Sequence, residues 1–181
     1  SGGYVKKIPL VDFEYKAQGT NIIKLTEDQG DVVKVLQSPE EGDLLIFTKM
    51  GKILRFPVAE ISPATIGSKG VVGIKLDRGD KVVGMRVLRG EKFLLIITEK
   101  GTVQKIASEY VPRKSRGSKG LSILTRERLV DILPLGKGQS LDLMLITQEG
   151  SVFYDRVREE ELPLNKAQRR WNAKIVKVVI K

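Results

Sequence analysis

The sequence predicts an all-β protein of the propeller type, built from about four repeated units of four strands each. Three segments support this fold class, at residues 43–48, 93–98 and 142–147, because each is a run of mainly apolar residues that ends in Thr-x-x-Gly. The glycines that close these segments, Gly51, Gly101 and Gly150, lie 50 and 49 residues apart. With a period of about 49, the 181 residues correspond to about 3.7 units. Self-similarity at such a period is typical of propellers and other repeat folds.

Other marks recur in the same phase. Gly3 lies 48 residues before Gly51, and a proline follows each of these glycines six positions later. Gly-Asp pairs at 30–31 and 79–80 lie 49 residues apart, and Ser-Lys-Gly triplets at 68–70 and 118–120 lie 50 apart. We therefore expect one domain over residues 1–181, divided into repeat units at about 1–48, 49–98, 99–147 and 148–181, the last incomplete.

Each unit predicts four short strands. The first is continuously apolar, as expected for a strand that is covered on both faces, and the hairpin glycine can take the left-handed conformation of a tight turn. The second strand alternates between apolar and polar residues, and a long basic connection follows it. In the unit that contains Gly51, the third and fourth strands are expected at 71–76 and 81–87. The one short helical turn expected lies at 156–162, before Pro163.

The phase of the repeat also predicts incomplete ends. The chain begins at the second strand of one unit, and the last unit is expected to end after its third strand, near residues 175–180. Two explanations remain open, namely that the termini complete each other or that the chain is part of a longer one. Units of this kind must stack on neighbours to bury both faces of their sheets.

The composition excludes several classes of enzyme. The chain has no His and no Cys, so it lacks an imidazole base, a Ser-His-Asp triad, a thiol nucleophile and a Cys-ligated zinc site. No apolar run approaches the ~20 residues of a membrane span, and no signal peptide is evident, so we expect a cytoplasmic protein without membrane contact. The 32 Lys and Arg exceed the 22 Asp and Glu and give a net charge of +10. This excess favours a polyanionic partner, although charge that only aids solubility is the alternative.

Basic residues recur in phase with the units. Positions four residues after the hairpin glycines hold Lys7, Arg55, Lys105 and Tyr154, so three of the four are cations. Residues 111–120 contain four basic residues and no acid, and residues 165–181 contain six and no acid. Stacked units would place these connections along one curved rim, which suits a bent duplex held by its phosphates. Solvated turns with lysines for solubility are the alternative. The candidate duplex-binding residues are Arg55, Lys69, Gly70, Lys105, Arg113, Lys114, Arg116, Lys119, Gly120, Arg169, Arg170 and Lys174, the glycines allowing close backbone approach.

Catalytic and metal motifs are weak. The acidic residues Asp155 and 159–161 are interleaved with Arg156 and Arg158, so a solvated acidic turn is favoured over a metal or acid–base site. No phosphate-binding loop of the form G-x-x-x-x-G-K-[ST] is present. Most of the aromatic residues fall within strand patterns, which favours a duplex over a single strand, since single-strand binders usually display stacking aromatics.

The repeated marks D-L-L-I-x-T-x-x-G-x-x-x-R, S-K-G-V and G-D-x-V-V resemble the C-terminal domain of the A subunit of bacterial type IIA topoisomerases, the group of DNA gyrase and topoisomerase IV. The resemblance covers essentially the whole chain. It implies a β-pinwheel, in which outer strands are exchanged between neighbouring blades and a basic rim binds and bends or wraps double-stranded DNA.

The resemblance also implies a role without catalysis or cofactor in this domain, within an ATP-hydrolysing isomerase. The implied partners are DNA, the preceding cleavage domain of the same polypeptide, and the ATPase B subunit in an A2B2 assembly in the nucleoid. Gyrases carry the box Q-R-R-G-G-R/K-G, and the nearest match, residues 168–174, keeps Q-R-R but replaces both glycines. Residues 115–120 are a second partial match. This departure favours relaxation and decatenation over negative supercoiling.

Two other functions remain open from the residues alone. One is a propeller-like module that binds acidic protein partners, and the other is a basic RNA-binding β protein. Binding that grows with duplex length would favour DNA over the first, and competition by structured RNA would favour the second.

Overall fold

A computed structural model gives the fold and describes residues 1–123 and 126–181. Strands form four separate sheets, and no helix in these ranges is long and apolar enough to cross a membrane. The strands are β1 (Tyr4–Val5), β2 (Asp43–Thr48), β3 (Lys52–Pro57), β4 (Val71–Val72), β5 (Val82–Leu88), β6 (Phe93–Thr98), β7 (Thr102–Ala107), β8 (Leu121–Ser122), β9 (Leu129–Leu135), β10 (Ser140–Thr147), β11 (Val152–Arg158), β12 (Ala167–Arg169) and β13 (Ile175–Ile180).

Each complete sheet combines strands from two sequence units. The orders are β5-β2-β3-β8 and β9-β6-β7-β12, with every neighbouring pair antiparallel. The outermost strand, β8 or β12, belongs to the following unit and crosses back to pair with β3 or β7. The predicted all-β pinwheel with exchanged outer strands is therefore confirmed.

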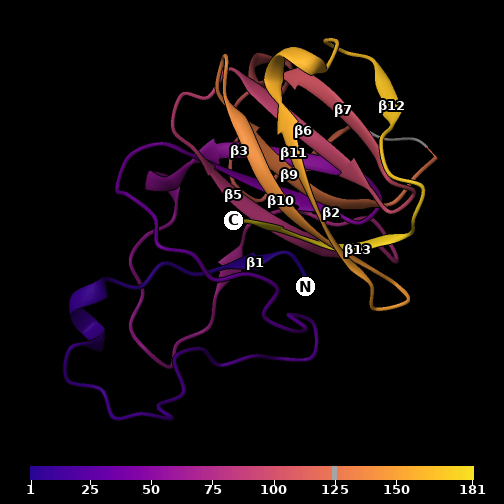
Figure 1. Cartoon of the computed structure of the whole chain (residues 1–181). Helices are drawn as coiled ribbons and strands as arrows, with labels where there is room; N and C mark the ends of the chain where they lie inside the picture. The colour runs from indigo at the N-terminus through magenta and orange to yellow at the C-terminus, as the bar shows by residue number, and fades with distance from the viewer. Residues whose placement is uncertain (124–125) are drawn as a thin grey trace.

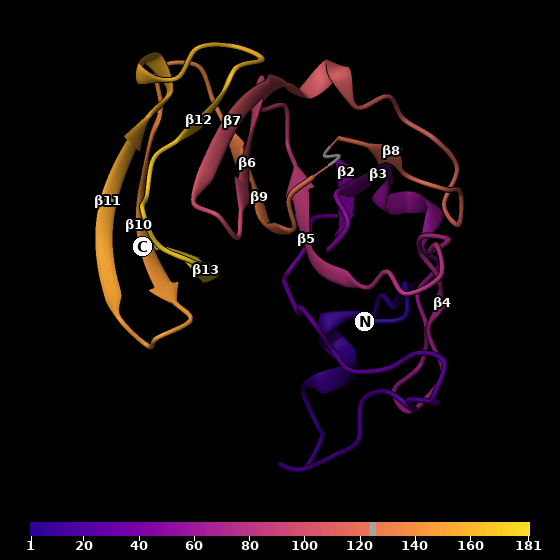
Figure 2. The same ribbon diagram turned by 90° about the vertical axis from the view of Figure 1, so that its right-hand side faces the viewer.

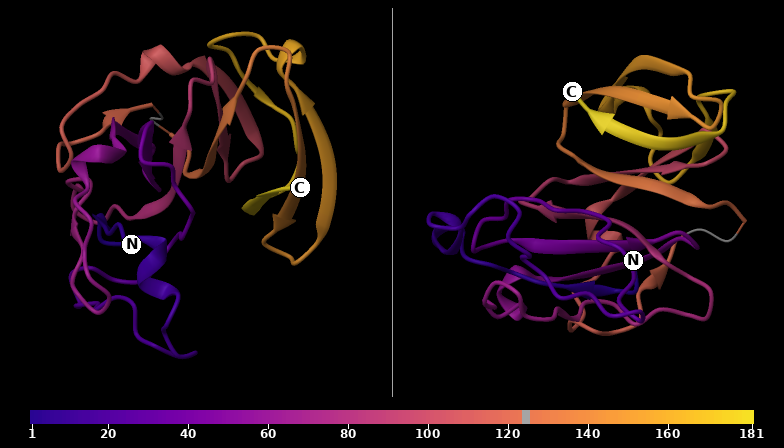
Figure 3. Two further views of the ribbon diagram at one scale, coloured as in Figure 1. Left: turned by 90° about the vertical axis from the view of Figure 1, so that its left-hand side faces the viewer. Right: turned by 90° about the horizontal axis from the view of Figure 1, so that it is seen from below.

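The sheets are arranged as blades in an open arc (Figure 1). In the view of Figure 2, β5, β9 and β13 lie toward the inside of the arc, and β8 and β11 lie toward the outside. The sheet β13-β10-β11 forms one end, and the N-terminal segment with β1 and β4 forms the other (Figure 3). The connections that join second strands to exchanged strands consequently lie on the outer side of the arc.

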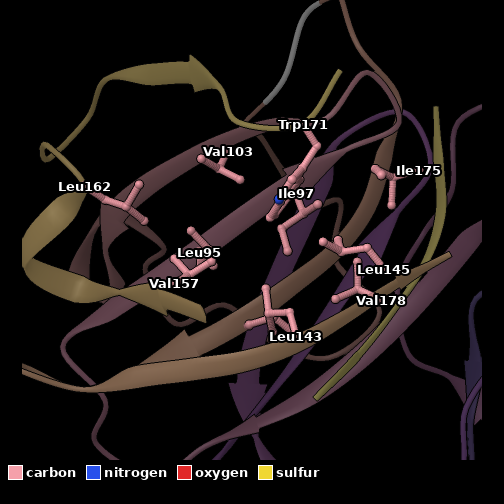
Figure 4. Packing of buried hydrophobic residues seen from close by; sticks show 11 residues of the cluster. Leu95, Ile97, Val103, Leu143, Leu145, Val157, Leu162, Trp171, Ile175 and Val178 are labelled. Atoms are coloured by element: carbon pink, nitrogen blue, oxygen red, sulfur yellow. The ribbon is translucent and has the colours of Figure 1, made fainter. Parts of the chain in front are cut away.

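The core lies between blades. On β2, Leu44 and Ile46 contribute to one apolar cluster, and Leu45 and Phe47 contribute to the cluster on the opposite face. β2 is therefore covered on both faces, as its continuous apolar pattern predicts. A third cluster joins β6 and β7 to the last sheet and includes Trp171 (Figure 4).

The hairpin glycines have the conformation that the sequence predicts. Gly3, Gly51, Gly101 and Gly150 all have positive φ, between 76° and 89°. At Gly101 a Cβ would also lie 2.1 Å from the carbonyl oxygen of Trp171, where the chain that continues from β12 passes over the hairpin. Glycine is required there both for the turn and for close packing of the exchanged segment.

The structure corrects three details of the sequence-based prediction. Residues 175–180 form β13, which pairs with β10 in the position of a fourth strand, so they are not the third strand of the last unit. That third strand is β12, which crosses to β7. The third strand expected at 71–76 is limited to β4, because it adds to the edge of another sheet over only two residue pairs. Besides the turn at Glu159–Glu161 (η4), short 3-10 helices occur at Leu10–Phe13 (η1), Val58–Glu60 (η2) and Ser108–Tyr110 (η3).

The N-terminal unit has a sheet of two strands. Its sheet consists of β1 and the exchanged strand β4, and the segment 14–41 contains no strand. Residues 31–36 correspond in sequence to the start of β5, the fourth strand of the next unit. In each of the other units, the fourth strand pairs with a first strand.

Candidate nucleic-acid interface

Three connections lead from second strands to exchanged strands. We call residues 58–70, 108–120 and 159–166 the first, second and third connections; each begins with a 3-10 helix. The second connection lies against the chain that follows the first, since Gly117 N donates to Gly73 O at 2.7 Å and Lys75 N donates to Ser118 O at 3.1 Å. Arg116 N in the second connection also donates to Glu60 Oε2 in the first at 2.7 Å, so these two connections lie side by side.

Arg55 on β3 is held in the joint between two blades. Its Nε donates to Asp43 Oδ2 at 2.6 Å, and its Nη1 donates to the carbonyl of Ser108 at 3.2 Å at the start of the second connection. Arg113 from the same connection also reaches Asp43, at 2.9 Å. The Asp43 side chain is 3% exposed, so it serves as a buried anion between two guanidinium groups.

Lys105 occupies the equivalent position on β7 and is more deeply buried. Its Nζ donates to the carbonyl of Glu159 at 2.9 Å and to the Glu159 carboxylate, and it lies 4.8 Å from the centre of the Phe93 ring. The Lys105 hydrogen bond, together with that from Gly138 N, holds the pKa of Glu159 below its ordinary value. Arg55 and Lys105, which occupy equivalent positions in the repeat, thus each connect one blade to the following unit.

Arg116 and Arg170 are also bound within the protein. Arg116 Nε donates to the carbonyl of Glu60 at 3.0 Å, and its Nη1 donates to the carbonyl of Val72 at 2.5 Å. Arg170 makes two hydrogen bonds to Asp155, at 2.7 and 3.2 Å. Burial alone would raise the pKa of Asp155, but the hydrogen bonds from Arg170 and Trp171 outweigh it, so this pKa lies below its ordinary value.

The remaining predicted cations are exposed. Arg113 and Lys119 each have 64% of their side chain exposed, and the nearest carboxylate to Lys119 Nζ is Asp77 at 3.8 Å. An ion pair of that length at the surface contributes little to stability. The other exposed candidates are Lys69 in the first connection, Lys114 in the second, Arg169 on β12 and Lys174 beyond it.

The two candidate glycines have a structural reason to be glycine. A Cβ at Gly70 would lie 2.9 Å from the carbonyl oxygen of Val5, and one at Gly120 would lie 2.8 Å from that of Ile53. Val5 and Ile53 are the strand positions against which the exchanged strands pair. Both glycines therefore allow the exchanged strand to approach the neighbouring blade closely.

Two features of the last blade were missed by sequence reasoning. Arg156, rather than Tyr154, places a cation beside the first strand, with hydrogen bonds of 2.5 and 3.0 Å to Asp142. The third connection is also shorter. Asn165, whose N donates to Lys105 O, lies only three residues before Gln168, which pairs with Val103. In the second connection, Lys114 makes the equivalent bond to Arg55 O and lies seven residues before Leu121, which pairs with Ile53. An alignment of the units on their 3-10 helices, rather than on the hairpin glycines, places Arg156 opposite Arg55 and Lys105 and shows the shorter connection.

Three acidic residues of the last blade, Asp155, Glu159 and Glu161, each face a cation. Asp155 binds Arg170, Glu159 binds Lys105, and Glu161 binds Arg158 at 2.8 Å. In the part of the chain that the structure describes, no group of three or more acidic side chains is arranged to hold a metal ion. These carboxylates act as counter-ions within and between blades.

Comparison with known proteins identifies the family. The family described as DNA gyrase C-terminal domain, beta-propeller, matches in three consecutive segments, at residues 1–39, 42–89 and 92–135. These segments cover well over half of the chain. The chain belongs to this family.

Relatives in the gyrase C-terminal domain family agree with this assignment. The A subunit of DNA gyrase from Escherichia coli strain K12 is 34% identical over 88% of this chain. The A subunit of DNA topoisomerase 4 from Streptococcus pyogenes serotype M3 is 30% identical over 67%. The chain covers 18% and 15% of these two proteins, so it spans less than a fifth of their length.

Two solved structures share the fold of this chain. They are the C-terminal domain of DNA topoisomerase IV, with a TM-score of 0.84 at 20% identity, and the DNA gyrase A C-terminal domain, with 0.78 at 18%. The alignments include 98% and 99% of this chain and cover 58% and 63% of those domains. The chain therefore has the fold of these C-terminal domains and matches about three fifths of their length.

Proposed function

We propose that this domain binds and bends double-stranded DNA along its outer rim, as a non-catalytic part of a type IIA topoisomerase. The observation that carries the proposal is the contact between the first and second connections, where Arg116 N donates to Glu60 Oε2 at 2.7 Å. We infer that the exposed cations of these two connections share one continuous surface. Such a surface can hold successive phosphates of a curved duplex without reading bases.

The structure divides the candidate cations into two groups. Four of them donate hydrogen bonds to carboxylates and carbonyls of the protein, so we assign them a positioning role; they are Arg55, Lys105, Arg116 and Arg170. The exposed candidates can reach phosphates, and they are Lys69, Arg113, Lys114, Lys119, Arg169 and Lys174, of which Arg113 also binds Asp43 through its Nε. The four in the first two connections would give a log–log salt slope of about −4.

We further propose that the domain works within an A2B2 assembly, in which the chemistry is performed by the cleavage domain of the same polypeptide and by the ATPase B subunit. Relaxation and decatenation are favoured over negative supercoiling. In the box-like stretch 168–174, Arg170 binds Asp155 and the indole of Trp171 packs in the core, so two of its seven side chains face inward. A stretch so engaged has fewer groups left for wrapping DNA.

The decisive experiment measures binding to a duplex of ~150 bp as a function of salt for the double variant Lys114→Glu and Lys119→Glu. The matched control is Lys100→Glu with Lys137→Glu, which makes the same change of charge at exposed lysines outside the three connections. We expect a slope about two units flatter for the first pair, since each lost phosphate contact removes ~0.9. Equal slopes for the two pairs would refute the rim.

Two further measurements separate the alternatives. Affinity that is the same for 20 and 150 bp duplexes would favour a module for acidic protein partners, and displacement by structured RNA would favour an RNA-binding role. A change in plasmid linking number with excess domain would favour gyrase-like wrapping, whereas binding without such a change is expected here.

A further inference from the structure

A pocket of about 140 Å³ lies on the inner side of the arc, opposite to the outer rim. It is formed by β5, β9 and β13, the fourth strands of three units, and by the segment 31–36, which corresponds to the start of a fourth strand. Valines from all four segments line it. Its volume is well below the ~300 Å³ at which pockets for drug-sized ligands begin, so any ligand of this pocket is small.

The charged residues that line this inner pocket do not balance. They are three cations, Lys34, Arg86 and Lys177, and one acid, Asp131. Both oxygens of Asp131 are already bound, because Arg86 Nη2 donates to Oδ2 at 2.5 Å and Ile132 N donates to Oδ1 at 2.8 Å. Two positive charges are therefore in excess, beside an ion pair between β5 and β9.

The guanidinium group of Arg86 has one further N–H to satisfy. Its Nε is buried, and no residue in the part of the chain that the structure describes accepts a hydrogen bond from it. A buried N–H of a charged group is costly without an acceptor, so an oxygen is expected beside it. A water molecule would accept this bond but would not oppose the two excess charges, whereas an anion would do both.

The low exposure of the ion pair strengthens the electrostatic field in the inner pocket. The side chains of Arg86 and Asp131 are only 17% and 12% exposed. Burial raises the pKa of Asp131 above its ordinary value, by more than the attraction of Arg86 lowers it. The charge of Lys34 also acts on this carboxylate, which places Lys34 close to the pair. Charges interact more strongly in such a setting than at the open surface.

Lys177 reaches the same place through the repeat. It occupies on β13 the position that Asp131 occupies on β9, since each pairs with the residue before the last threonine of its first strand, next to a β-bulge. Position in the repeat therefore turns both residues toward the inner side of the arc, where both line the pocket.

We propose that this inner pocket binds a small, doubly charged oxyanion of the phosphate class, which connects the fourth strands of neighbouring units. One oxygen of the anion accepts the hydrogen bond from Arg86 Nε, and Lys34 and Lys177 supply the remaining positive charge. The small volume selects a free ion over the phosphate group of a larger molecule such as a nucleotide. The pocket shares no residue with the outer rim, so the proposal holds whether or not the rim binds DNA.

The test follows the Arg86 Nε–H resonance of the whole chain by NMR, with inorganic phosphate added at constant pH and ionic strength. We expect a saturable shift, because this proton gains an anionic acceptor, and Arg86→Lys identifies the resonance by removing it. Lys34→Gln with Lys177→Gln should weaken the apparent affinity at least ~10-fold, since two charged contacts are lost. The matched control, Lys114→Gln with Lys119→Gln, removes the same charge from exposed lysines of the outer rim and should leave the affinity unchanged.

Two further measurements give effects of opposite sign. Asp131→Asn removes the one negative charge of the pocket and keeps an oxygen for Arg86, so phosphate should bind several-fold more tightly than to the parent. The unfolding midpoint of the parent should rise by about 3 °C or more at a phosphate concentration of roughly ten times the dissociation constant. The double variant at Lys34 and Lys177 should show no such rise at the same concentration.

Three results would overturn the proposal. The first is an Arg86 resonance that phosphate does not shift, which would leave water as the acceptor. The second is an equal loss of affinity in the pocket and rim variants, which would mean that phosphate binds only to general surface charge. The third is adenosine monophosphate binding as tightly as phosphate, which would contradict a site for a free ion.

Discussion

The two complete joints between blades both contain a cation bound to a carbonyl group and a counter-ion, but different residues supply these groups. Both place a cation on the second strand and direct it at the carbonyl that opens the next connection, Ser108 for Arg55 and Glu159 for Lys105. In the first joint the counter-ion is Asp43, from the same blade as Arg55. In the second joint Phe93 replaces that aspartate, and the counter-ion is Glu159 of the following unit.

This difference shows that the repeat keeps the direction of the cation but not the source of its counter-ion. The first joint is a network, since Asp43 also receives Arg113. The second joint depends on a single lysine, enclosed by an aromatic ring and one carboxylate. Removing one partner of a buried ion pair leaves an uncompensated charge, whereas Asp43 still faces one guanidinium group when the other is removed.

The largest effect is therefore expected from Lys105→Met. Removing this amine leaves the Glu159 carboxylate buried without a cation, and we expect the unfolding midpoint to fall by about 5 °C or more. Arg55→Met should cost clearly less, because Arg113 still faces Asp43. Differential scanning calorimetry of the two variants ranks them, and adding Glu159→Gln to Lys105→Met should restore part of the loss. The reverse ranking would contradict this account of the joints.

An intermediate effect is expected from pH. The pKa of Glu159 is lowered from its ordinary 4.5 by Lys105, so the folded state binds its proton less tightly than the unfolded state does. The stabilisation is therefore fully present above about pH 4.5 and is lost as the pH falls through the folded-state pKa. The thermal unfolding midpoints of Glu159→Gln and the parent should differ at about pH 6 and converge toward about pH 3. A gap that widens in acid would show that Glu159 is not held as an ion by Lys105.

The smallest effect is expected from Arg156→Met. The Arg156 and Asp142 side chains form the same kind of arginine–aspartate pair as the first joint, but they are 59% and 46% exposed. Solvent screens such a pair, so we expect no measurable change in the unfolding midpoint. A fall comparable to that of Arg55→Met would mean that the geometry of the pair, rather than its burial in a joint, determines its contribution.

The fold was largely predictable because the repeat carries it in local patterns. The apolar run at Leu44–Phe47 predicts a strand covered on both faces, and the hairpin glycines predict the turns. The identity of β13 as a fourth strand was not predictable, because the third strand of its unit shrinks to β12 after a shortened connection. Spacing from the hairpin glycine therefore misplaces both.

The candidate site was predicted only as a surface. Sequence spacing identifies the connections and their basic residues but does not distinguish Lys105, buried against Glu159, from Lys114, which is exposed. That distinction depends on partners 54 residues away in the chain, which become neighbours only when the outer strands are exchanged. The same long-range contacts explain Gly70 and Gly120, whose neighbours Val5 and Ile53 lie in the preceding unit.

The exchange of outer strands also has an evolutionary consequence. Because every unit lends its third strand to its predecessor, a duplication or deletion of about 49 residues regenerates the same pairing wherever in the repeat its ends fall. Blades can thus be gained or lost by a single recombination event without designing a new interface. The length of the proposed DNA-binding rim, and with it the angle through which a duplex would turn, would then change by whole blades.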